Sequence, residues 1–498
     1  MHLSLAHAAD RLHRTLGSTM FFYGLVGLFV LGSAWIAIAS LYPMAFDEEF
    51  HYGLIRIYAS SVLPYGIEHT SDMAQYGAAT ADASYLFHYL MSFPYRLLDF
   101  AGLSDTAIII FLRMLNIAFV AAALVIFRKA LLTAKVSRPV THVALLLVTL
   151  VPIFPLLAAH INYDNLLLLV FAWCLLSIIK ITDAVRGGKA FPLVYTFQLT
   201  IAVLIGMSIK YAFLPLALGL FVWLIWLLAL AYRKHRQTVT TQLAGFRTEW
   251  KRLSRNARWL MIAASLISAF FASHYLTNTL SYGSPIPSCE RVFSESECTA
   301  YGPWNRNKNM EARKSEAFEP MPYVSYIATE WVPGMTQRLT FAVAGKTNDF
   351  DTKLPLPVLV YTLLILTALG VICLAVQIAR KRSTWLTALT ALLAVLYAGI
   401  LSFQLYGDYV DTAEPVAING RYLIPLLPLV AVVLIQAMRG VLRPISGRLL
   451  AVAFLPLLLL LVIGGAGVGT YIVQAGTHWF WPGFGQTSHD FLRNIFKL

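Results

Sequence analysis

Residues 20–51 read MFFYGLVGLFVLGSAWIAIASLYPMAFDEEFH, an apolar run followed by three consecutive carboxylates, Asp47, Glu48 and Glu49, and by His51. A run of about 20 apolar residues crosses a hydrocarbon layer of roughly 30 Å as an α-helix. A charged side chain at the centre of that layer costs on the order of 2.5 to 3.5 kcal/mol. The stretch therefore predicts a membrane-spanning helix with an acidic cluster just beyond its end.

Apolar runs of this kind recur along the whole chain. It has 498 residues, of which 58% are hydrophobic and only 13% are charged. The runs are longer than the alternating strands of a β-barrel, so we expect an all-α polytopic membrane protein with about eleven spans. The expected spans are residues 20–41, 107–127, 141–159, 164–181, 192–207, 211–231, 259–276, 356–378, 385–405, 422–438 and 449–473.

The first span has one alternative reading, a secretory signal peptide. Arg11 and Arg14 precede it, and the small residues at 37–39 resemble a cleavage site. Its apolar run is longer than the usual core of a signal peptide, which favours a retained anchor.

Basic residues collect at alternate ends of the spans. They lie at the N-terminus and in the connections at 128–138, 180–189, 233–258, 380–382 and 439–448, where only Asp10, Asp183 and Glu249 are acidic. The positive-inside rule then predicts a cytoplasmic N-terminus. The net charge of +13 needs no nucleic-acid partner, because a basic inner face meeting anionic membrane lipid accounts for it.

The opposite connections carry the unusual polar residues. Besides the acidic cluster and His51, they contain HINYDN (160–165), SIKYAF (208–213) and GDYVDTAEPVAINGRY (407–422). Because these connections are short, their side chains stay near the ends of the spans. We expect them to converge on one extracytoplasmic cavity at the membrane surface.

Chemically, this set combines a base with an anion clamp. Asp47 or Glu48 could remove a proton from an acceptor hydroxyl, and Lys210 and Arg421 could hold a phosphate. Each residue also has an ordinary structural reading, such as a lysine or arginine that reaches the interface from a helix end.

A second acidic element lies at Asn162 and Asp164, where Asp164 could instead cap the following helix. Acidic side chains also bind divalent cations through oxygen. Asp47, Glu48 and Asp164 could hold Mg²⁺ or Mn²⁺, but their spacing is not diagnostic, so the need for a metal stays open.

Two longer stretches also fall on the outer side. Residues 83–103 are rich in aromatic and aliphatic side chains but are interrupted by Pro94, Arg96 and Asp99, which favours helices lying in the membrane interface. The other stretch, residues 278–353, is the one sizeable insert.

This insert contains Cys289 and Cys298, which an oxidising compartment would allow to form a structural disulfide. Its Trp304, Tyr323 and Trp331 either shape an acceptor site or form the core of a small loop domain.

The order of these motifs resembles the GT-C superfamily of integral membrane glycosyltransferases. The motifs are the acidic cluster after the first span, the interfacial stretch, FLRMLN (111–116), NYDN (162–165), KY (210–211) and GRYLIPLLP (420–428). More narrowly, the chain is similar to the bacterial DUF2142 family over most of residues 20–440. That family often has Asp-Glu-Pro before its histidine, whereas Glu49 replaces the proline here, which leaves open whether Asp47 or Glu48 is the base.

The resemblance implies a division into three regions. Residues 1–277 would form a transmembrane module with interfacial helices at about 50–103, residues 278–353 an extracytoplasmic loop, and residues 354–498 a C-terminal transmembrane module with an outer tail. It also implies a protein of the bacterial cytoplasmic (inner) membrane.

The activity implied is transfer of a sugar, with inversion, from a polyprenyl-phosphate donor to a glycan, lipid or protein acceptor on the outer face. Asp47, with Glu48 beside it, takes the place of the catalytic base. The expected substrate and phosphate contacts are Lys210, Arg421, Tyr211, Tyr422 and His51, with Asp164 and Asn162 near the acceptor or a metal. A lipid-borne donor is also consistent with the absence of a glycine-rich nucleotide-binding motif.

The main rival is a transporter or lipid flippase of the cell envelope, which Arg113 inside the second span favours. Against it, the other ionisable residues lie at span ends, and the spans contain no paired set broken by Gly or Pro. A structural subunit is a third alternative, which predicts that the outer charges can be neutralised without loss of function.

Overall fold

The computed structural model describes residues 2–44, 47–64, 67, 69–189, 191–234, 254–340, 356–441, 456–459, 461 and 466–496. All named elements within these residues are helices, as expected for an all-α chain. In the N-terminal half they are α1 (His2–Gly17), α2 (Thr19–Ala39), α3 (Glu48–Ser60), η1 (Ser71–Thr80), α4 (Leu86–Phe100), α5 (Asp105–Thr133), α6 (Arg138–Thr149), α7 (Ile153–Ala158), α8 (Tyr163–Arg186), α9 (Leu193–Ile209), η2 (Tyr211–Phe213) and α10 (Leu214–Lys234).

The remaining elements begin after the basic connection that follows α10. They are α13 (Arg255–Tyr282), α14 (Cys289–Val292), α15 (Glu295–Cys298), α16 (Gly302–Arg313), α17 (Tyr323–Tyr326), η3 (Ile327–Trp331), α18 (Val332–Thr340), α19 (Leu356–Ala379), α20 (Trp385–Thr412), η5 (Gly420–Leu426), α21 (Leu427–Val441), α23 (Val468–Gln474), η6 (Thr477–Trp479) and α24 (Phe484–Phe496).

Eight helices in the described residues are long and apolar enough to cross a membrane. They correspond to the predicted spans that begin at residues 20, 107, 164, 211, 259, 356, 385 and 422. The chain is therefore an α-helical polytopic membrane protein. The predicted span at 192–207 is the shorter apolar helix α9, and the one at 449–473 lies largely outside the described residues.

The predicted span at 141–159 is wrong as a single helix. The chain leaves the helical path between Thr149 and Ile153, which separates α6 from α7. Pro152 lacks a backbone N–H, and Pro155 follows closely, so a continuous helix would lose hydrogen bonds here. At the break, the carbonyl of Leu150 accepts a hydrogen bond from the backbone of Gly467 at 2.8 Å.

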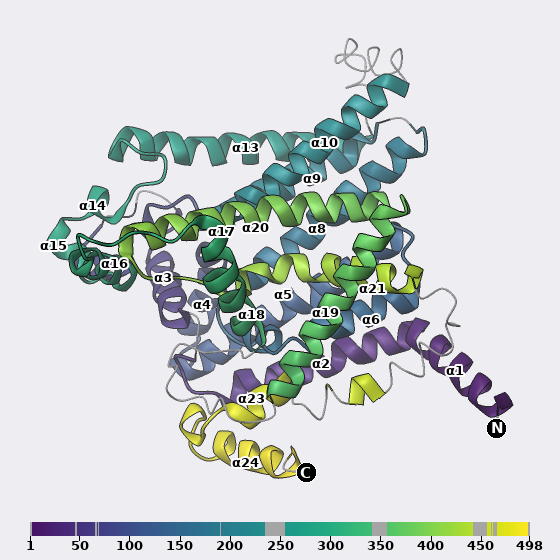
Figure 1. Ribbon diagram of the computed structural model, residues 1–498. Coiled ribbons are helices and arrows are strands. Elements are labelled where there is room, and N and C mark those ends of the chain that lie inside the picture. The colour runs from purple at the N-terminus through teal and green to yellow at the C-terminus, as the bar shows by residue number, and fades with distance from the viewer. Residues whose placement is uncertain are drawn as a thin grey trace.

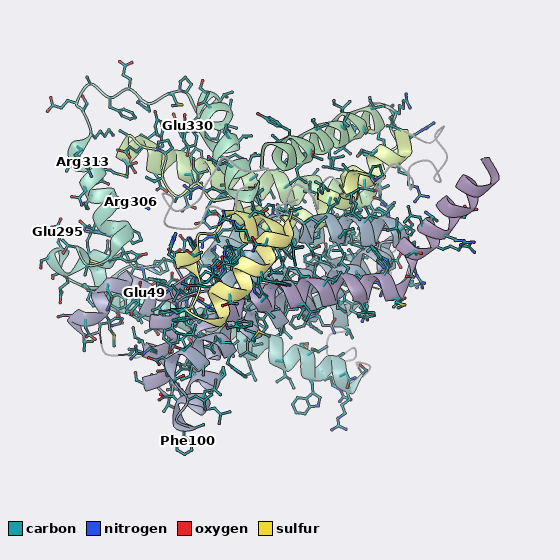
Figure 2. All side chains as sticks on the ribbon, turned by 90° about the horizontal axis from the view of Figure 1, so that it is seen from below. Glu49, Phe100, Glu295, Arg306, Arg313 and Glu330 are labelled. Atoms are coloured by element: carbon teal, nitrogen blue, oxygen red, sulfur yellow. A yellow bond between two sulfur atoms is a disulfide. The ribbon has the colours of Figure 1, made fainter. Side chains whose placement is uncertain are left out.

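The bundle has two distinct ends (Figure 1). The N-terminal helix α1 and the far end of α10 lie on one side, and α3, α4 and the insert helices α14 to α16 lie on the other. Glu49 of α3 lies at the same end of the molecule as Glu295 and Arg306 of the insert (Figure 2). The basic helix ends are thus separated from the acidic cluster by the length of the bundle.

Helix α3 explains how one end of the bundle is organised. Its buried residues are Glu48, His51, Tyr52, Leu54, Ile55 and Tyr58, which share one face of a 3.6-residue period. Asp47 and Glu49 point to the exposed side. Helical phase therefore buries Glu48 and exposes Glu49, while Asp47 is exposed as the N-cap residue, with a left-handed backbone at φ +65°.

Candidate functional site

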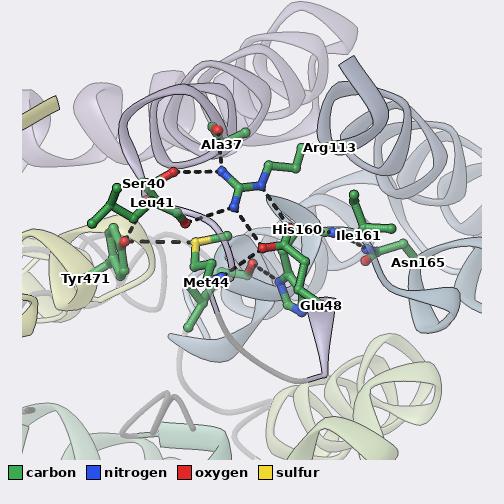
Figure 3. A network of polar contacts seen from close by, with 11 residues as sticks. Ala37, Ser40, Leu41, Met44, Glu48, Arg113, His160, Ile161, Asn165 and Tyr471 are labelled. Carbon is green, nitrogen blue, oxygen red and sulfur yellow. Dashed lines mark hydrogen bonds and ion pairs between the residues drawn. The ribbon is translucent and has the colours of Figure 1, made fainter. Parts of the chain in front are cut away.

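The buried carboxylate, Glu48, forms an ion pair with Arg113 of α5 (Figure 3). The guanidinium donates from Nε to Oε1 and from Nη2 to Oε2, each at 2.8 Å. The backbone N–H groups of Met44 and Ile161 also donate to this carboxylate, at 2.8 and 3.1 Å. Each carboxylate oxygen of Glu48 thus accepts one hydrogen bond from Arg113 and one from a backbone N–H group.

The guanidinium of Arg113 also uses each of its three nitrogens in hydrogen bonds. Besides its bonds to Glu48, it donates from Nη1 to the carbonyls of Ala37 and Ser40 and from Nη2 to that of Leu41, at 2.8 to 3.0 Å. These carbonyls lie at the C-terminal end of α2, where the helix leaves acceptors unpaired and its dipole favours a cation. The pair therefore fastens α2, α3, α5 and the α7–α8 junction together.

This arrangement argues against Glu48 as a general base. Burial alone would raise the pKa of its carboxyl, but the Arg113 guanidinium outweighs burial and lowers the pKa. A carboxylate with four donors directed at it has little capacity left for a substrate proton. Glu48 is better explained as the partner that allows an arginine to lie inside an apolar helix.

Asp47 has a different environment. Its side chain is 62% exposed, and Oδ2 accepts a hydrogen bond from Arg421 Nη2 at 3.0 Å. Arg421 Nε lies 3.8 Å from Asp164 Oδ2, and Asp164 Oδ1 accepts from Lys210 Nζ at 2.8 Å. Two carboxylates and two cations, from four separate parts of the chain, thus form one continuous cluster, which we call the charge cluster.

Local turns bring three of these four side chains into place. Asn162 caps α8 and accepts a hydrogen bond from the backbone of Asp164 at 2.9 Å. Asn419 does the same two residues before Arg421, at 3.1 Å, where η5 begins. Lys210 has an extended backbone between α9 and η2, which turns its side chain away from the helix axis.

Lys210, Asp164 and Arg421 are almost fully covered. Burial disfavours the ammonium of Lys210, but the adjacent Asp164 carboxylate outweighs burial and raises the pKa of the lysine. Lys210 is therefore charged at neutral pH. An anion entering the cluster would meet two preformed cations in a poorly solvated position.

Aromatic rings cover the cations. The Lys210 ammonium lies 4.4 Å from the ring centre of Tyr163 and 4.7 Å from that of Tyr422. The ring centre of His51 lies 4.5 Å from that of Tyr163 in an edge-to-face arrangement, and His51 Nδ1 is 2.9 Å from His88 Nε2. Tyr422 and His51, both predicted as site residues, thus belong to the wall of the charge cluster.

Tyr211 lies at the edge of the cluster. Its backbone N–H donates to Ser84 Oγ at 2.9 Å, and its side chain is 46% exposed. Tyr211 therefore links the charge cluster to the segment between η1 and α4.

The three carboxylates named for a metal site are each paired with a basic side chain. Glu48 is bound to Arg113, Asp164 to Lys210, and Asp47 to Arg421. Across the described part of the chain, no group of three or more His, Cys, Asp or Glu side chains is arranged to hold a metal ion. The three carboxylates serve basic side chains in this structure.

Sequence reasoning missed the roles of Arg113, Tyr163, His88 and Asn116. Asn116 accepts hydrogen bonds from the backbone of Asn162 and the side chain of Asn165, at 3.4 and 3.1 Å, so α5 also supports the α8 turn. One signal was available, because an arginine inside a span needs a carboxylate partner. A second signal was the 3.6-residue helical period, which places Glu48 on the same face of α3 as the buried His51, Tyr52 and Ile55.

In the insert, Cys289 and Cys298 form a disulfide. Trp304 donates from Nε1 to Glu290 at 3.0 Å and packs against the buried cysteines. Tyr323 and Trp331 pack against α20 or the helices beside it, with the Tyr323 hydroxyl 2.7 Å from Ser402 Oγ. Trp304 therefore packs inside the insert, whereas Tyr323 and Trp331 pack toward α20 and do not form the core of a separate loop domain.

The fold defines the class, an α-helical polytopic membrane protein with a charge cluster at one end of its bundle. No family model and no curated protein matches the chain. Its function must therefore be inferred from the charge cluster and its surroundings.

Proposed function

We propose that this protein is a membrane glycosyltransferase of the GT-C type. It would transfer a sugar from a polyprenyl-phosphate donor to a glycan, lipid or protein acceptor. The observation that supports this most is the contact between Asp47 and Arg421, which places an exposed carboxylate against a buried cation at the ends of apolar helices. Such a site offers a base and a phosphate clamp at the depth where a lipid phosphate lies.

In the proposed reaction, Asp47 removes the proton of an acceptor hydroxyl as its oxygen attacks the anomeric carbon of the donor. The bond from that carbon to the phosphate oxygen breaks, and the electron pair leaves with the polyprenyl phosphate. Arg421 and Lys210 neutralise the charge of the leaving phosphate. Attack opposite the leaving group inverts the anomeric centre.

The charge cluster suggests how the base is released. Without donor, Arg421 holds Asp47 at 3.0 Å. The donor phosphate, a diester with one negative charge, would compete for the same guanidinium, because bidentate binding of phosphate by arginine is strong. Donor binding would then free Asp47 to accept a proton, so that the base becomes active only when the donor is present.

We place the charge cluster on the extracytoplasmic side of a bacterial cytoplasmic membrane, with the N-terminus in the cytoplasm. The basic helix ends at the opposite end of the bundle support this orientation. A lipid-linked donor would be flipped before use, and the oxidising outer compartment favours the Cys289–Cys298 disulfide.

The test is transfer by the purified protein in lipid nanodiscs, with a panel of polyprenyl-phosphate sugars and lipid or glycan acceptors. Asp47→Asn should reduce turnover by about 10² or more, as loss of a general base does. Arg421→Ala should raise the KM for the donor, since it removes a phosphate contact.

The matched control is Glu49→Gln, an exposed carboxylate two residues away on the same helix. This variant should retain wild-type turnover. Full activity of Asp47→Asn would refute the mechanism. A wild-type protein that moves the lipid-linked sugar across the bilayer but never transfers it would instead support the flippase alternative.

A further inference from the structure

The disulfide-closed part of the insert is docked onto the first outer loop. Cys289, Phe293 and Cys298 pack against Ala74 of η1 in one apolar cluster. The Ser71 hydroxyl donates to Glu297 at 2.6 Å, while Glu297 also forms a capping box with Ser294. Helices α14 and α15 are therefore held at a fixed place over η1.

This docking places Tyr301 against the first outer loop. Tyr301 follows the second cysteine by three residues, and its backbone N–H donates to the Cys298 carbonyl at 3.0 Å. Its ring lies directly on Gly77, where an added Cβ would come within 2.6 Å of the ring. Gly77 also has a φ of +57°, which favours glycine.

Tyr301 also lies beside the helix that carries Asp47. Its ring centre is 6.3 Å from that of Phe50, one helical turn after Asp47, and Phe50 is 5.7 Å from Tyr76. Burial, together with Tyr211, Asp47 and Asp82, raises the pKa of Tyr301 to about 12. Within the described residues, no hydrogen bond engages its hydroxyl.

We propose that Tyr301 is a substrate-binding residue whose ring and hydroxyl hold a sugar ring beside Asp47, and that the disulfide-closed insert fixes it there. This inference rests on the proposed glycosyl transfer. A partly covered aromatic surface with one unused polar group, close to a carboxylate, suits a ligand that presents both C–H faces and hydroxyls. The sugar held could belong to the donor or to the acceptor.

The experiment measures KM and kcat separately for donor and acceptor in the wild type, Tyr301→Ala, Tyr301→Phe and Gly77→Ala. Tyr301→Ala should raise the KM for one of the two substrates about tenfold or more, with a smaller change in kcat. A folded Gly77→Ala variant should raise the same KM, because its methyl group displaces the Tyr301 ring and the residue strains the left-handed backbone beneath it. The substrate whose KM rises identifies the sugar that is held.

Tyr323→Phe is the matched control for Tyr301→Phe. It also removes a phenol oxygen from the insert, but that oxygen contacts Ser402 and lies outside the proposed sugar site. Of these two phenylalanine variants, only Tyr301→Phe should raise a KM. Because it removes a single oxygen atom, this variant also provides the test if the alanine variants fail to fold. Wild-type KM values in every folded Tyr301 and Gly77 variant would overturn this inference and leave the proposed function standing. A wild type that transfers no sugar would overturn both.

Discussion

At the scale of single residues, the structure gives two neighbouring carboxylates, Asp47 and Glu48, different environments. Glu48 is 1% exposed and paired with a fully buried Arg113, whereas the Asp47 side chain is mostly exposed. Removing one partner of a buried ion pair leaves an uncompensated charge, which is strongly destabilising. An exposed carboxylate contributes far less to stability.

We therefore predict that Glu48→Gln lowers the free energy of unfolding by roughly 3 to 5 kcal/mol, while Asp47→Asn changes it by less than about 1 kcal/mol. Thermal unfolding of the purified variants in one detergent measures the difference. Asp47→Asn should lose activity without losing stability. A Glu48→Gln protein as stable as the wild type but inactive would reinstate Glu48 as the base.

At the scale of elements, a pair of buried histidines joins α3 to α4. His51 Nδ1 lies 2.9 Å from His88 Nε2, and both rings are inaccessible to solvent. Burial lowers the pKa of His88 to about 3. Burial, followed by the neighbouring His88, also holds the pKa of His51 well below its usual range. Both rings are therefore neutral in the folded protein at physiological pH.

This predicts a loss of stability as the pH falls. In the unfolded chain a histidine titrates near pH 6.5, so below that pH the unfolded state binds protons that the folded state does not. Stability is retained above about pH 6.5 and should fall by about 2 kcal/mol for His88 between pH 7 and pH 5. Unfolding temperatures measured across this range give the slope.

His88→Gln should reduce that slope by the share that His88 contributes, while the other buried histidines, such as His160, maintain the rest. Equal slopes for the wild type and His88→Gln would show that the α3–α4 contact does not depend on neutral histidines. The distinction matters for the proposed function, because α3 carries Asp47 at its N-terminus.

At the scale of the whole molecule, the basic helix ends and the acidic cluster occupy opposite ends of the bundle. The proposed orientation predicts which exposed positions meet the outer medium. Cys174 and Cys373 are not in the disulfide and are replaced first. Glu319→Cys in the insert should then react with a membrane-impermeant maleimide in intact spheroplasts. Arg380→Cys, just after α19, should react only once the membrane is permeabilised.

The reverse labelling pattern would place the charge cluster in the cytoplasm. That outcome would exclude an extracytoplasmic acceptor. The native Cys289–Cys298 disulfide does not interfere, because its sulfurs are already bonded to each other.

The sequence by itself determined the helical class and the positions of most spans. A long apolar run in a membrane forms a helix, because only a helix satisfies its backbone hydrogen bonds within one segment. The apolar runs therefore gave the order of the helices and the positions of eight spans. The same logic failed at residues 141–159, where Pro152 and Pro155 divide an apolar run whose overall hydropathy shows no break.

Only the tertiary structure decided how the polar residues pair. Arg113 and Glu48 are 65 residues apart in sequence, and Asp47 and Arg421 are 374 apart. No local spacing encodes such a contact, because it depends on how several helices pack against one another. The sequence could place acids and bases at the ends of spans, but only the packing of the helices buried one carboxylate with an arginine and left its neighbour exposed beside a buried cation.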